Sequence, residues 1–141
     1  MKEVCMKVSI AMAHAKARSA PAAGSKSDPS AVVTKALIRS ASFLQLSQGD
    51  VAAILQTSPA TISRVFAGRL IEQKGATWEL ALLFIQVYRS LSSLMGGDDE
   101  TSREWLFSDN KHLHGVPIER MKSVRGLVDV ADYLDAMRGR L

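Results

Sequence analysis

Two short helical patterns lie only three residues apart in this 141-residue sequence, over residues 48–55 and 59–67. Ser47, followed by Asp50 three residues later, predicts a capping box at the start of the first pattern. Residues 56–58, which join the two patterns, allow only a tight turn, and this is the spacing of a helix-turn-helix. The pair restricts the possible folds more than any other feature of the sequence.

The side chains of this pair divide into an inner and an outer set. Apolar residues recur at positions that would face the inside: Val51, Leu55, Ile62 and Val65. Small residues stand where the two helices would cross: Ala52 and Ala53. Small or polar residues occupy the outer face of the second helix: Ala60, Thr61, Ser63 and Arg64. We predict a DNA-binding motif whose second helix enters the major groove. Two core helices with the same spacing are the alternative.

The remaining chain also has helical periodicity. Asp28 followed by Pro29 is a typical helix start. Apolar residues at spacings of three and four predict further helices over about 77–95, 99–108 and 123–138. The period-two alternation of a half-buried strand is not found. The predicted fold class is therefore all-α, with a helix-turn-helix bundle followed by a small helical domain.

Composition divides the chain into segments. Residues 19–28 are small and polar and contain Pro and Gly, which predicts a linker. We expect residues 1–27 to form a flexible basic N-terminal arm. Residues 28–76 are assigned to the helix-turn-helix domain, 77–97 to a long apolar linking or dimerisation helix, and 98–141 to the C-terminal domain.

Basic side chains are concentrated in the first half of the chain. Residues 1–75 contain ten basic and four acidic side chains, whereas the remainder contains eight and ten. A basic half suits a polyanion such as DNA. A net charge of only +4 for the whole chain is also compatible with a role in solubility alone.

Several classes of protein are excluded or disfavoured. Cys5 is the single cysteine, which excludes a disulfide framework. No run of about 18 apolar residues predicts a membrane span, and Lys7 interrupts the apolar stretch that a secretion signal would need. We expect a cytoplasmic protein without a membrane partner.

No constellation of residues predicts catalysis, a metal site or a cofactor. His112 and His114 lack the further ligands of a zinc site and are interpreted as ordinary loop histidines. Residues 98–100, Asp-Asp-Glu, are interpreted as a helix cap rather than a cation site. We expect neither a cofactor nor a metal, and the protein is not expected to be an enzyme.

Residues 46–68 resemble the helix-turn-helix of Xre and phage-repressor proteins, most clearly at Thr61–Arg64 and at Gly68. Arg64 is long enough for a bidentate contact with guanine, although a phosphate contact or a solvated side chain is equally compatible. Gln48 matches the family's backbone-binding glutamine at a helix N-terminus. The expected DNA-binding residues are Gln48, Ser58, Ala60, Thr61, Ser63, Arg64 and Arg69; for Ser58 a cap and for Arg69 an exposed charge are the alternatives.

The helix predicted over residues 77–95 is apolar on more than one face. One stripe contains Leu80, Phe84, Val87, Leu91 and Leu94; another contains Trp78, Leu82, Ile85 and Tyr88. Such a helix is either central to the core or packs a partner on one side. We expect a homodimer, since helix-turn-helix proteins usually bind two half-sites. Leu91 is one possible interface position and a possible core position.

Residues 104–141 resemble the toxin-binding domain of Xre/MbcA/ParS-type antitoxins. The matching residues are Trp105, Leu106, Asn110, Leu113, Gly115, Pro117, Gly126, Val130, Tyr133 and Leu134. At Arg125 the sequence departs from the acidic residue that is usual in the family, so the toxin subclass stays open. Together the two resemblances cover about residues 30–141.

The resemblance implies an antitoxin that covers the active site of a cognate RES-type, NAD-consuming toxin and represses their shared operon. The residues expected to bind toxin are Tyr133, Met137, Arg138, Arg140 and Leu141, the last three as a polar tail beyond the final helix. A frayed and unused terminus is the alternative for this tail. A plain transcriptional repressor without a toxin partner, or a pure inhibitor with a degenerate helix-turn-helix, are the other functions that the sequence leaves open.

Overall fold

The structure is a computed structural model that describes residues 28–139. Its helices are α2 (Pro29–Phe43), α3 (Gln48–Ile54), α4 (Pro59–Phe66), α5 (Gly75–Leu94), α6 (Asp99–Phe107), α7 (Pro117–Arg120) and α8 (Val124–Gly139). The described residues form no strand, only an isolated bridge between Asn110 and Gly115. The all-α prediction is confirmed. The arm proposed for residues 1–27, together with Arg140 and Leu141, lies outside the described residues.

Local capping explains where α3 and α4 begin and end. The Ser47 hydroxyl accepts from the Asp50 amide while the Asp50 carboxylate accepts from the Ser47 amide, so the predicted capping box is present. Gln56 in the turn has a φ of 54°, and Gly68 after α4 has a φ of 128°. Both values fall in the left-handed region that ends a helix.

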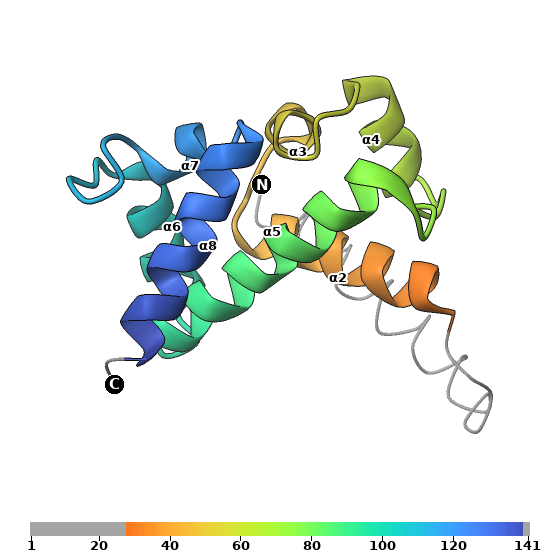
Figure 1. Ribbon diagram of the computed structural model, residues 1–141. Helices are drawn as coiled ribbons and strands as arrows, with labels where there is room; N and C mark the ends of the chain where they lie inside the picture. The colour runs from red at the N-terminus through yellow and green to blue at the C-terminus, as the bar shows by residue number, and fades with distance from the viewer. Residues whose placement is uncertain (1–27, 140–141) are drawn as a thin grey trace.

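The 20-residue helix α5 is the centre of the fold (Figure 1). It packs against α2 on one side and most extensively against α8 on the other. Leu91 and Val87 are completely buried and Phe84 is 1 % exposed. Leu91 is therefore a core position and cannot serve as an interface residue, because the tertiary packing around α5 uses its side chain internally.

The opposite stripe of α5 is only partly covered. Trp78 is buried at 8 % exposure, whereas Leu82 is 39 % exposed. Ile85 and Tyr88 are half-buried, and the Tyr88 ring stacks on Phe43 of α2 with 5.9 Å between the ring centroids. Leu82 is thus the member of this stripe that is most available to a partner.

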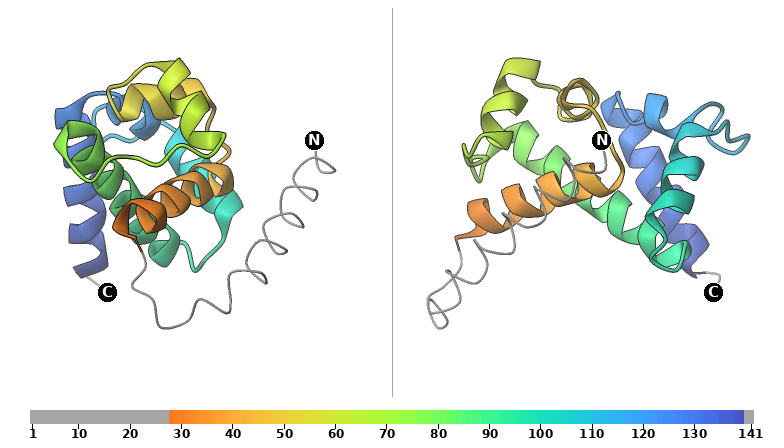
Figure 2. Two further views of the ribbon diagram at one scale, coloured as in Figure 1. Left: turned by 90° about the vertical axis from the view of Figure 1, so that its right-hand side faces the viewer. Right: turned by 180° about the vertical axis from the view of Figure 1, so that it is seen from behind.

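Helices α2–α4 lie on one side of the molecule and α6–α8 on the other, with α5 running between them (Figures 1 and 2). Three contacts outside α5 join the two sides. The Lys122 ammonium lies 3.2 Å from the Asp50 carboxylate, and the Gln56 side-chain amide donates to the Lys122 carbonyl at 2.8 Å. The Arg103 guanidinium donates to the Phe43 carbonyl at 2.8 Å. The turn of the helix-turn-helix is therefore attached directly to the C-terminal half.

Among the described helices, none taken singly has the length and hydropathy of a membrane span; α5 and α6 reach that threshold only as a pair bent by 115°.

Candidate functional site

The outer face of α4 presents the side chains expected for base recognition. Ala60, Ser63 and Arg64 are exposed, and Thr61 is half-buried. On the inner side of the same helix, Ile62 and Val65 are buried at 0 % and 3 % exposure, which fixes which face points outward. The structure thus gathers four of the predicted DNA-binding residues on one surface: Ala60, Thr61, Ser63 and Arg64.

Ser58 and Thr61 are engaged with each other at the start of α4. The Ser58 hydroxyl accepts from the Thr61 amide at 3.1 Å, and the two hydroxyls share a hydrogen bond of 2.8 Å. Capping of α4 is therefore sufficient to explain why a serine occupies position 58. Gln48, the first residue of α3, is exposed beside the N-terminus of that helix, where backbone N–H groups favour an anion.

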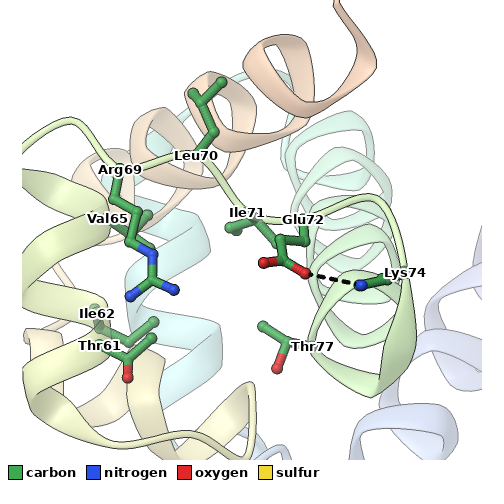
Figure 3. A pocket seen from close by; sticks show the side chains of 9 residues that line it. All are labelled: Thr61, Ile62, Val65, Arg69, Leu70, Ile71, Glu72, Lys74 and Thr77. Atoms are coloured by element: carbon green, nitrogen blue, oxygen red, sulfur yellow. Dashed lines mark ion pairs between the residues drawn. The ribbon is translucent and has the colours of Figure 1, made fainter.

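A cavity of about 290 Å³ lies between α4, the connection that follows it and the start of α5 (Figure 3). Arg69, from the connection, extends along the α4 side of this cavity. On its far side, the Lys74 ammonium lies 3.5 Å from the Glu72 carboxylate, with both side chains exposed. Lys74 is a basic group that faces the predicted recognition helix across this cavity, and the sequence analysis did not single it out. Lys74 lies outside the helix-turn-helix motif, so the motif gave no reason to consider it.

The contact between Asp50 and Lys122, which joins the helix-turn-helix to the C-terminal half, is accompanied by a shifted pKa at each group. Burial raises the pKa of Asp50, but hydrogen bonds from Lys122 and Ser47 and the charge of Lys122 outweigh this effect, so the pKa lies below its usual value of 3.8. The hydrogen bond to Glu119 is the main reason that the pKa of Lys122 is raised above 10.5; burial opposes it and Asp50 adds to it. Both groups are therefore charged at neutral pH.

Tyr133, a predicted toxin-binding residue, is held in an aromatic stack. Its ring lies 6.2 Å from Trp105 and 5.8 Å from His112, measured between ring centroids, with interplanar angles of 17° and 26°. His112 therefore has a packing role that the sequence analysis missed. No spacing along the chain predicts that a loop histidine meets a tyrosine 21 positions later.

Next to this stack is a second cavity, of about 360 Å³. Its lining residues are His112, Leu113, His114, Arg120, Asp129, Asp132 and Tyr133. Two of these lining residues form an ion pair, with 3.3 Å between the Arg120 guanidinium and the Asp129 carboxylate. Over residues 28–139, no group of three or more His, Cys, Asp or Glu side chains is arranged to hold a metal ion.

The end of α8 differs from the predicted tail. Arg138 belongs to the helix and donates to the Ser90 hydroxyl of α5 at 3.1 Å. It therefore does not lie beyond the helix, because α5 offers a partner that continues α8 through this residue. Met137 is half-buried.

Two family models match the chain. The model of the antitoxin Xre-like helix-turn-helix domain matches residues 24–86, and that of the antitoxin Xre/MbcA/ParS C-terminal toxin-binding domain matches residues 90–140. No curated protein matches the sequence. The two families are regulatory and binding domains without catalytic activity, so the chain is not an enzyme.

Proposed function

The chain belongs to the Xre-type antitoxins, with a DNA-binding helix-turn-helix and a toxin-binding domain, and from this premise we propose that it neutralises a RES-type, NAD-consuming toxin. We further propose that it represses the operon that encodes both proteins, and that it does so in the cytoplasm. The observation that carries the proposal is the presence of both matched domains on one chain, with the outer face of α4 exposed in the first.

DNA binding is assigned to residues 28–76 and toxin binding to residues 98–141, with residues 77–97 linking the two. In support, the bases would be read by the exposed side chains of α4, of which Arg64 alone has a long cationic group. Gln48, Arg69 and Lys74 flank this helix and are suited to phosphate.

We propose that the antitoxin acts as a homodimer on a two-fold operator. The exposed stripe of α5 around Leu82 supports this assignment, since a 39 % exposed leucine lies on the helix that joins the two domains. A two-fold axis at this stripe would place two copies of α4 on one operator.

For the toxin, we propose that residues 140–141 enter the active-site cleft, which would be built for an anionic dinucleotide. An Arg side chain in such a cleft can form bidentate bonds with acidic groups. Arg138 is proposed to contact the toxin from the last turn of α8, because its side chain is 48 % exposed even though its guanidinium donates to Ser90.

Co-expression with the RES-type toxin that the proposal expects in the neighbouring reading frame tests the proposal. The full chain is expected to restore growth and cellular NAD, whereas a chain lacking residues 140–141 is expected to protect less while retaining its fold and DNA binding. This deletion keeps Arg138, so no contact with Ser90 is lost. A chain that binds its own promoter yet gives no protection would identify a plain repressor instead. Full protection by the shortened chain would show that the tail is not the inhibitory element.

A further inference from the structure

Lys122, in the connection between α7 and α8, contacts both ends of helix α3. At the first turn of α3, the Asp50 carboxylate lies 3.2 Å from the Lys122 ammonium. Just after the last turn, the Gln56 side-chain amide donates to the Lys122 carbonyl at 2.8 Å. Figure 1 shows α3 beside the start of α8, where these contacts are made. We call this pair of contacts the Lys122 clamp.

The Gln56 side of the clamp uses the whole amide nitrogen. This nitrogen donates to the Lys122 carbonyl and to the Ala53 carbonyl of α3, each at 2.8 Å. Because the amide nitrogen carries two N–H groups, Gln56 can join the end of α3 to the C-terminal half. The φ of 54° at Gln56 suits glycine better than an L side chain. The turn itself therefore does not explain why a glutamine occupies this position.

The ion pair of the clamp is fixed from both sides. The Lys122 ammonium lies 2.9 Å from Glu119 of α7, and the Asp50 carboxylate also accepts from the Ser47 amide in the capping box. The side chains of Lys122 and Asp50 are only 30 % and 26 % exposed. A partly buried pair is screened less than one in open water. Lys122 thus meets a carboxylate whose position is set by the first turn of α3.

Helices α3 and α4 form a pair that other helices hold only loosely through the backbone. They pack most closely against each other, whereas the closest neighbours of α5 are α8 and α2. The pair joins the common core through buried side chains such as Leu55 and Ile62. Apolar burial is non-directional, whereas hydrogen bonds depend on angle as well as distance. The Lys122 clamp therefore supplies contacts that fix the orientation of the pair.

We propose that Gln56 and Lys122 are positioning residues for operator recognition, an inference that rests on the proposed function. The clamp holds α3, and through it the recognition helix α4, at the angle that fits DNA. The proposed function assigns a phosphate contact to Gln48 at the start of α3 and base contacts to the outer face of α4. Both helices meet one duplex at once, so a rotation of the pair would misplace both sets of contacts.

The clamp crosses the boundary between the two matched domains. Asp50 and Gln56 belong to the residues matched to the helix-turn-helix domain, and Lys122 belongs to those matched to the toxin-binding domain. The second domain therefore contributes to DNA recognition by holding the helices that read the operator.

Two substitutions at Gln56 remove the amide but differ in their effect on the backbone. Gln56→Gly relaxes the turn, because glycine adopts a positive φ readily, whereas Gln56→Met keeps a side chain of similar length without a donor. Both are expected to raise the Kd for a duplex that covers the promoter of the operon it is proposed to repress. The expected rise is about fivefold, since the apparent Kd grows as the binding-competent orientation becomes less populated. A random-sequence duplex of equal length should bind each variant like the wild type, because no charge changes.

Gln45 provides a matched control. It is also an exposed glutamine with a φ of 54°, and it lies just before α3 as Gln56 lies just after it. Its side chain has no hydrogen-bond partner among residues 28–139. Gln45→Gly and Gln45→Met are expected to leave the promoter Kd within about twofold of the wild type. Circular dichroism establishes that all four variants are folded.

Two further measurements test the clamp independently of the Gln56 affinities. Lys122→Met, which releases Asp50, is expected to lower the ratio of promoter to random-duplex affinity, whereas Lys111→Met, at an exposed lysine of the same domain, should leave this ratio unchanged. In both Gln56 variants, the Thr57 amide of the turn is expected to exchange hydrogen faster, because local opening becomes easier. The amides of α5 should exchange as in the wild type.

The outcomes separate the clamp from the proposed function. An unchanged promoter Kd in the Gln56 variants, or an unchanged affinity ratio in Lys122→Met, would overturn the clamp and leave DNA binding standing. An equal loss for both duplexes would show that Gln56 contacts the DNA backbone itself and would also overturn it. A loss in only one Gln56 variant, or a similar loss in the Gln45 variants, would assign the effect to the new residue instead. A wild type that does not prefer its promoter to the random duplex would overturn the clamp and the proposed function together.

Discussion

Substitutions at single residues of α4 and α8 are expected to affect different properties of the protein. Arg64 is exposed on the outer face of α4, whereas Gly126 is buried where α8 passes the end of α7. A side chain built at Gly126 would place its Cβ 1.8 Å from the Arg120 carbonyl oxygen. A substitution at Arg64 therefore tests the proposed DNA contact, whereas a substitution at Gly126 tests the packing of the fold.

Arg64→Ala is expected to weaken specific operator binding by about 1–3 kcal/mol, because a bidentate base contact is lost. Gel-shift titration at fixed salt measures this loss, and circular dichroism should be unchanged. Arg89→Ala is the matched control, since Arg89 is also an exposed arginine but lies on α5, away from the recognition helix. Equal operator affinity of the wild type and Arg64→Ala would contradict base reading by this side chain.

Gly126→Ala is expected to lower the free energy of unfolding by about 1–3 kcal/mol, because the Arg120 carbonyl is backbone and cannot yield as a flexible side chain would. Thermal and urea unfolding measure this change. Gly139→Ala provides the control, since nothing lies within 4 Å of a Cβ built there. Equal stability of the two variants would show that α8 shifts away from α7 without cost.

At the scale of the element, α5 combines two kinds of surface on one helix. Its buried stripe holds the two halves together, and its other stripe leaves Leu82 exposed. Substitutions on the same helix should therefore separate folding from assembly.

Leu82→Glu is expected to convert the proposed dimer into a folded monomer, because a charge is placed in the interface but not in the core. Leu91→Glu is its counterpart and is expected to unfold the protein, because Leu91 is 0 % exposed and the charge would be buried without a partner. Sedimentation gives the oligomeric state and circular dichroism the fold. A wild-type protein that sediments as a monomer would refute the dimer.

At the scale of the whole molecule, Lys122 connects the two domains through its contact with Asp50. Because the folded-state pKa of Asp50 lies below its usual value, the ionised carboxylate stabilises the fold at neutral pH. This stabilisation is present above about pH 3.8, the usual value, and is lost as the pH falls through the lowered pKa. The raised pKa of Lys122 keeps its charge throughout this range.

Lys122→Met is expected to lower the free energy of unfolding at pH 7 by about 1 kcal/mol, since a partly buried ion pair is lost while the aliphatic stem is kept. The difference from the wild type should shrink as the pH falls through the lowered pKa of Asp50. Urea unfolding at several pH values measures it. Lys74→Met, which removes an exposed pair with Glu72, is the control and should change stability little. A difference that does not depend on pH would show that packing, not charge, accounts for the effect.

The sequence alone determined the helices and their class, because caps such as Ser47 with Asp50 and spacings of three and four act within a few residues. It also predicted the outward face of α4, since the apolar residues Ile62 and Val65 are three positions apart, as on one face of a helix, and polar residues stand between them. Tertiary structure alone decided which stripe of α5 is core, and it brought His112 to Tyr133, Lys122 to Asp50 and Arg138 to Ser90. These contacts join residues on different elements, so no local pattern encodes them. For the same reason, only the packing of α8 shows which of its apolar side chains stay exposed.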